Sequence, residues 1–158
     1  MQGLQLTSVL KLLRGGYSGS GLAAPVVLID AENKSGGALV KGDVVVYDRT
    51  NSDVNLISFT TTTSANDVDV LGMCAEAIAD GAIGKVQIWG PTKHLKVDGT
   101  TDIAVGDMLG TFTTAKIAAK STTGGRFARA MEAYATNDSA GVIDAFITNL
   151  NFGAFTTE

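Results

Sequence analysis

The segment Ala38-Leu39-Val40-Lys41-Gly42-Asp43-Val44-Val45 is an apolar run that stops at Gly-Asp and then resumes. Glycine permits a sharp bend or bulge in a strand, and the aspartate can accept hydrogen bonds from nearby backbone amides and hold the corner. The same order recurs in Asp102-Ile103-Ala104-Val105-Gly106-Asp107-Met108-Leu109. This similarity is too short to establish a repeat. We interpret Asp43 and Asp107 as corner residues rather than as a carboxylate pair for acid/base chemistry.

The pattern on both sides of these corners is that of an all-β protein. From Pro25 onward, short runs rich in Val, Ile, Phe and Thr alternate with Gly, Asp, Asn or Ser clusters at intervals of about 8 to 12 residues. No alternation of strands and helices follows, which excludes doubly wound nucleotide-binding folds. We expect a small β-barrel, β-tulip-like or sandwich domain. Strands are predicted near 25–30, 38–47, 54–60, 68–75, 84–89, 93–97, 107–112, 115–119, 126–133 and 141–148.

Two dipeptides predict turns between these strands. Asp98-Gly99 lies between Leu95-Lys96-Val97 and Thr100-Thr101, and it has the composition of a tight hairpin, whose central residues need positive φ. Asp80-Gly81 is a second, weaker turn signal. We therefore expect a hairpin at Asp98-Gly99.

The first 24 residues differ in character and are expected to form an N-terminal arm, with the β-rich domain at 25–158. Leu6, Val9, Leu10 and Leu13 are spaced as one face of a short amphipathic helix that Gly15-Gly16 would end. A Gly/Ser-rich linker follows at 17–21. Because so short a helix is marginal alone in water, its apolar face needs a surface, either on its own domain or on a neighbouring subunit.

Composition excludes several classes of function. The chain has 158 residues, 45% of them hydrophobic, which is enough for one compact domain. Its net charge of -4 argues against a nucleic-acid partner, since phosphate neutralisation gives such proteins their affinity. Its apolar runs fall far short of the roughly 20 residues of a membrane helix, and we identify no signal peptide. We expect a soluble protein made in the cytoplasm, with no membrane or nucleic-acid partner.

The sequence contains little that supports catalysis. Cys74 is the only cysteine and lies in an apolar stretch, so we interpret it as a buried thiol. His94 is the only histidine and is expected to face solvent on a strand. No metal-ligand spacing or phosphate-binding loop is present, so no catalytic residue, metal or cofactor is predicted. Gly141-Val142-Ile143-Asp144 resembles a segment of trimeric dUTP pyrophosphatases, but Ile147 replaces that family's tyrosine and its other motifs are missing.

The order of elements instead resembles the capsid decoration, or cement, proteins of tailed bacteriophages. The resemblance covers roughly residues 37–148. It lies in the spacing and apolar character of six segments, not in any catalytic group. These are Gly37 to Tyr47, Val70 to Glu76, Asp80 to Gly90, Ile103 to Leu109, Gly125 to Ala133, and Ala140 to Ile147.

The resemblance implies a non-enzymatic virion protein. Such proteins are commonly homotrimers on the outside of the capsid, where they bind the major capsid protein and stabilise its lattice. The arm before residue 25 departs from the shorter members of the family, and it either grips the shell or packs within the trimer. The alternative is another phage tail- or fibre-associated β-rich module that binds a host surface or a glycan.

Interface residues are predicted on both parts of the chain. On the arm they are the stripe residues Leu6, Val9, Leu10 and Leu13. Trp89 and Phe127 are expected to serve the core first and an interface second, because buried aromatic residues usually stabilise the fold. Arg126 and Arg129 either pair with acidic groups across a subunit boundary or are solvated.

Overall fold

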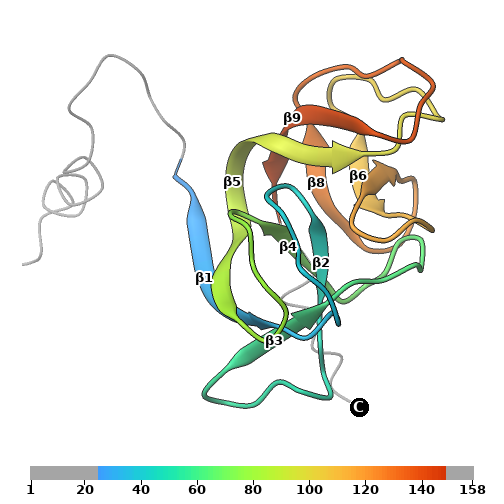
Figure 1. Cartoon of the computed structure of the whole chain (residues 1–158). Helices are drawn as coiled ribbons and strands as arrows, with labels where there is room; N and C mark the ends of the chain where they lie inside the picture. Colours follow the sequence, from blue (N-terminus) through green and yellow to red (C-terminus); the bar gives the residue numbers. More distant parts are fainter. Residues whose placement is uncertain (1–24, 149–158) are drawn as a thin grey trace, which may run out of the picture.

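The computed structural model describes residues 25–148, which form nine β-strands and no helix (Figure 1). The predicted helix at residues 6–13 lies outside this range. The all-β prediction is confirmed. The strands are β1 (Val27–Asn33), β2 (Val44–Tyr47), β3 (Ile57–Thr60), β4 (Val70–Cys74), β5 (Ile83–Val97), β6 (Met108–Thr111), β7 (Ala118–Lys120), β8 (Arg126–Ala130) and β9 (Gly141–Ile147).

The strands form two barrels that share one strand. The order β1-β3-β2-β4-β5 closes on itself because β1 also pairs with β5. The order β5-β7-β6-β8-β9 closes in the same way through β5–β9, although β5 and β7 meet at one residue pair only, Val97 and Ala118. Figure 1 shows β5 running from the lower group of strands into the upper group. Of the architectures expected from the sequence, the barrel is the one observed.

Strand β5 reaches both barrels because it is 15 residues long. Its first half, 83–89, pairs with β1, and its second half, 90–97, pairs with β9. The sequence predicts two separate strands here, 84–89 and 93–97. The predicted interruption between them is wrong, because one strand runs through both ranges. The chain continues through Gly90, whose φ of +103° only glycine adopts without strain.

The two barrels are copies of one five-stranded plan. In each, the first and third strands pair in parallel and the remaining pairs are antiparallel. The Gly-Asp corners correspond as well. The Val40 N–H donates to Asp43 Oδ2 at 2.9 Å, and the Ala104 N–H donates to Asp107 Oδ2 at 2.8 Å. The corner role predicted for both aspartates is confirmed, and the short sequence echo marks a true structural repeat.

The apolar core has two clusters, and the cluster of the second barrel extends onto β2 and β4 of the first through Val44, Val46, Val70 and Met73. Phe59, Leu71 and Val86 are fully buried in the first barrel. Phe127 and Leu95 are fully buried in the second, so Phe127 serves the core as expected. Among the described residues, the buried core side chains of the two clusters lie between positions 31 and 147.

One of the two predicted turns is correct. At Asp80-Gly81 the Ala82 N–H donates to the Ala79 carbonyl at 3.1 Å, and Gly81 has φ +72°. The hairpin predicted at Asp98-Gly99 is wrong, because β5 pairs with β9 and β7 rather than with the residues that follow it. Asp98 is instead buried, and its carboxylate accepts the Thr100 N–H at 3.0 Å.

Candidate contact surface

The residues that catalysis would need are separated or buried. Cys74 is fully buried, and burial raises the pKa of its thiol to about 12. His94 is exposed on β5, as predicted. Asp43 and Asp107 lie in different barrels, where they contact Lys96 and Lys120 at 2.5 and 2.9 Å. Within residues 25–148, no three His, Cys, Asp or Glu side chains come together as a metal site, and no helix suited to crossing a membrane occurs.

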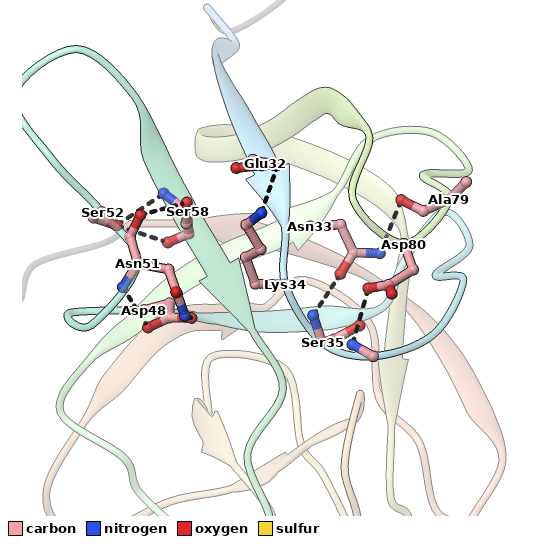
Figure 2. A network of polar contacts seen from close by, with 11 residues as sticks. Glu32, Asn33, Lys34, Ser35, Asp48, Asn51, Ser52, Ser58, Ala79 and Asp80 are labelled. Atoms are coloured by element: carbon pink, nitrogen blue, oxygen red, sulfur yellow. Dashed lines mark hydrogen bonds and ion pairs between the residues drawn. The ribbon is translucent and has the colours of Figure 1, made fainter.

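The densest polar network braces loops at one end of the first barrel (Figure 2). Asn33 is fully buried, and its Nδ2 donates to the Gly37 and Ile78 carbonyls at 2.9 and 3.1 Å. Its Oδ1 accepts the Ser35 N–H at 2.9 Å, so both ends of the amide have protein partners. Because these bonds join the loop after β1 to the loop before β5, Asn33 holds the barrel end closed.

The second half of the same network ties the loop between β2 and β3. The Asn51 Nδ2 donates to Asp48 Oδ2 at 2.7 Å, and this bond holds the pKa of the Asp48 carboxyl below its usual value. Ser52 and Ser58 exchange bonds, since Ser52 Oγ accepts the Ser58 N–H at 2.8 Å. Figure 2 shows both groups of contacts beside β1. The network is satisfied within the protein, which is the pattern of a structural brace.

Several exposed apolar residues lie where the two barrels meet, and we call this set the waist patch. It consists of Val26 just before β1, Val27 and Leu28 at the start of β1, and Trp89 at the middle of β5, with exposed fractions of 47, 43, 45 and 39%. Val27 lies directly opposite Trp89 in the β1–β5 register. Val27 and Trp89 are thus cross-strand neighbours, and exposed large apolar side chains of this kind can mark contact sites.

Phe146 and Arg129 extend this surface across the second barrel. The Phe146 ring meets the Trp89 ring edge to face, with centroids 5.4 Å apart. Arg129 is exposed on β8 and lies opposite Phe146 in the β8–β9 register. An ion pair between Lys93 on β5 and Asp144 on β9, 3.6 Å apart, lies farther along these two strands. An aromatic centre with an arginine beside it is the composition enriched at protein–protein contacts.

The structure places the predicted interface residues unevenly. Trp89 is partly exposed rather than in the core. Its ring contacts the ring of Phe146, and Phe146 lies opposite Arg129 on the neighbouring strand. Arg126 is exposed at the start of β8, opposite Gly110, and the register does not bring it to the waist patch. The four arm residues Leu6, Val9, Leu10 and Leu13 lie outside the described range.

The sequence analysis did not identify Val27 and Phe146. Phe146 alternates with the buried residues Ala145 and Ile147 on a predicted strand, so its outward direction could have been inferred, whereas Val27 lies among exposed residues at the start of β1. Their proximity to Trp89 could not be inferred, because it depends on β5 pairing with β1 on one half and β9 on the other.

Comparisons with known proteins point to one fold. No protein-family model matches the chain, and no curated protein is similar to it. Among solved structures, the chain is similar to the head fiber gp8.5 N base of bacteriophage phi29, with a TM-score of 0.51 and 19% sequence identity. The match covers 79% of this chain and 96% of that one. At this identity the likeness shows a shared fold.

Proposed function

We propose that this chain is a structural protein of a bacteriophage virion. It binds the outside of the capsid as a homotrimer and stabilises the lattice of the major capsid protein. The observation that carries the proposal is the fold shared with a phage head fiber base over nearly the whole of that base. The resemblance of the sequence to capsid decoration proteins supports the same assignment from a separate direction.

The physical character of the chain fits a role in adhesion. Its exposed aromatic and arginine side chains suit protein contacts, and an aspartate side chain holds each of the two Gly-Asp corners through a hydrogen bond from the backbone. A protein repeated over a lattice needs only modest affinity at each copy, since many copies add their contacts. No cofactor enters this function.

The proposed function is tested by measuring whether the protein binds to phage heads. Full-length protein should co-sediment with heads of the phage that encodes it, and light scattering should give three times the 16.3 kDa chain mass. Heads loaded with the protein should release their contents at a higher temperature than bare heads. Failure to sediment with heads at saturating protein would overturn the assignment.

Arg129 offers a test of the subunit contact. It is exposed beside Phe146, so Arg129→Glu should shift the trimer toward monomer if this side chain crosses a subunit boundary. Lys41→Glu is the matched control, because Lys41 is also exposed and the charge reversal is the same. Equal trimer stability in both variants would place the subunit contact elsewhere.

A second candidate is a fibre-associated module that binds a host surface or a glycan. The observation that favours it is that the similar phage protein is described as part of a head fiber. Under this alternative the purified protein should bind host cells or a glycan array and ignore heads. The two assays together separate the candidates.

A further inference from the structure

We propose that the waist patch is the seat of the apolar stripe Leu6, Val9, Leu10 and Leu13 of the same chain. In this patch Val26, Val27, Leu28 and Trp89 are each 39 to 47% exposed, and Val27 lies directly opposite Trp89. The stripe is a set of four aliphatic side chains that need a surface to lie on. This inference does not depend on the proposed virion function.

The position of the chain entry favours this seat. The first described residue, Pro25, lies against the middle of β5, since a Cβ added to Gly90 would be only 2.3 Å from the Pro25 carbonyl oxygen. The patch therefore begins one residue after the arm ends. Segment 14–24, rich in Gly and Ser, joins the stripe to this point, and a flexible linker of that length spans about 18 Å on average. The stripe can reach the patch without strain.

The short connection also decides between the chain's own arm and that of another molecule. A segment tethered by a short flexible linker experiences an effective concentration of its binding site in the millimolar range. At micromolar protein, a free second molecule is about a thousandfold more dilute. The chain's own stripe therefore fills the patch before that of a free second molecule, and the cross-linking test below distinguishes it from the stripe of a neighbour in the proposed homotrimer.

A second copy stacked end to end on β1 is disfavoured by charge. Inside the molecule, the Gly42-Asp43 corner of the first barrel packs against the second half of β5, where Lys96 Nζ lies 2.5 Å from Asp43. In the repeat, Glu32 on β1 takes the place of Lys96, and Asp107 takes the place of Asp43. Repeating this contact between two molecules would set two carboxylates together, so the stack would lack the Lys96–Asp43 ion pair that supports the contact inside the molecule.

The first test uses Trp89, the only tryptophan in the chain, as a probe of coverage. Leu10→Asp/Leu13→Asp should expose the indole, moving its emission to longer wavelength and raising its quenching by acrylamide. Ser8→Asp/Leu12→Asp is the matched control, because it adds the same charge at positions away from the stripe. Circular dichroism checks that each variant keeps its β content. Equal emission and quenching in the wild type and the stripe variant would overturn the proposal.

The second test identifies the owner of the stripe. Leu10→Cys/Val27→Cys treated with a short bismaleimide should give an intramolecular cross-link that keeps the monomer mass, whatever the protein concentration. Cys74 does not interfere because it is buried. Leu10→Cys/Val54→Cys is the control, since Val54 is 99% exposed in the loop between β2 and β3. Cross-links found only between molecules, in mixtures of the two single-cysteine chains, would assign the patch to another copy and overturn the proposal.

Discussion

Gly42 and Gly106 hold the same corner in the two barrels, with φ angles of +92° and +91°, yet within the described residues only the Cα of Gly42 faces another segment closely. A Cβ added to Gly42 would lie 2.0 Å from the His94 carbonyl oxygen, whereas one added to Gly106 would meet nothing within 4 Å. The difference arises because the first barrel's corner packs on β5 and the second barrel's corner faces open space. The repeat thus supplies its own matched controls.

The first prediction compares alanine at these two glycines. Gly106→Ala should lower the free energy of unfolding by about 1 kcal/mol, the cost of a left-handed backbone for a residue with a Cβ. Gly42→Ala adds a clash with backbone and should cost on the order of 4 kcal/mol. Urea unfolding followed by circular dichroism measures both. Similar losses in the two variants would mean that the corner does not pack on β5 as described.

The second prediction compares the two lysines that face the corner aspartates. The Asp43 side chain is 2% exposed and the Asp107 side chain 23%. Lys96→Met leaves a buried carboxylate without its cation and should cost about 3 kcal/mol. Lys120→Met leaves a carboxylate that water reaches and should cost under about 1 kcal/mol. Thermal unfolding ranks the two, and a larger loss at Lys120 would contradict the difference in burial.

The third prediction concerns the reactivity of Cys74. Its pKa of about 12 means that almost no thiolate forms at pH 8, and the fully buried sulfur is out of reach. Native protein should therefore resist Ellman's reagent, and one thiol per chain should react in urea. Rapid labelling of the native protein would show that the first barrel opens around β4.

The fourth prediction is an acid effect at Asp107. The hydrogen bond from Lys120 holds the pKa of this carboxyl below its usual 3.8. A folded-state pKa that is lower than the unfolded one stabilises the protein above that range, and the gain is lost as pH falls through the folded value. Asp107→Asn should therefore destabilise at pH 7 and match the wild type more closely near pH 2. Urea midpoints at the two pH values test it, and a constant difference would contradict the shift.

Local patterns in the sequence predicted most strands but not how they combine. Val44–Tyr47 is a run of β-branched and aromatic residues, and Val70–Cys74 is an apolar run. Both compositions favour strands, so these two elements could be predicted directly. The continuity of β5 through Gly90 and Pro91 could not be inferred, because both residues ordinarily interrupt strands. The hairpin expected at Asp98-Gly99 failed since the following chain pairs with Tyr134 through Ile103 instead.

The contact surface was predictable only in part. Trp89 and Arg129 are visible in the sequence as an aromatic and a cation on strands, but nothing local places them near one another. Their link runs through Phe146 on β9, which closes the second barrel from the far end of the chain. The repeat was hidden for a similar reason: backbone pairing is the same in both halves, while the side chains agree at only a few positions, such as the Gly-Asp corners and the pair Glu76 and Glu132.

The sharing of β5 by both barrels affects how the molecule comes apart. Removing this strand takes one wall from each half at once, so neither half can melt while the other stays intact. Neither β2 nor β6 pairs with β5. Their amide protons should nevertheless exchange with solvent through the same rare global opening. Residues 25–148, which consist of two such units, should therefore unfold as one cooperative body.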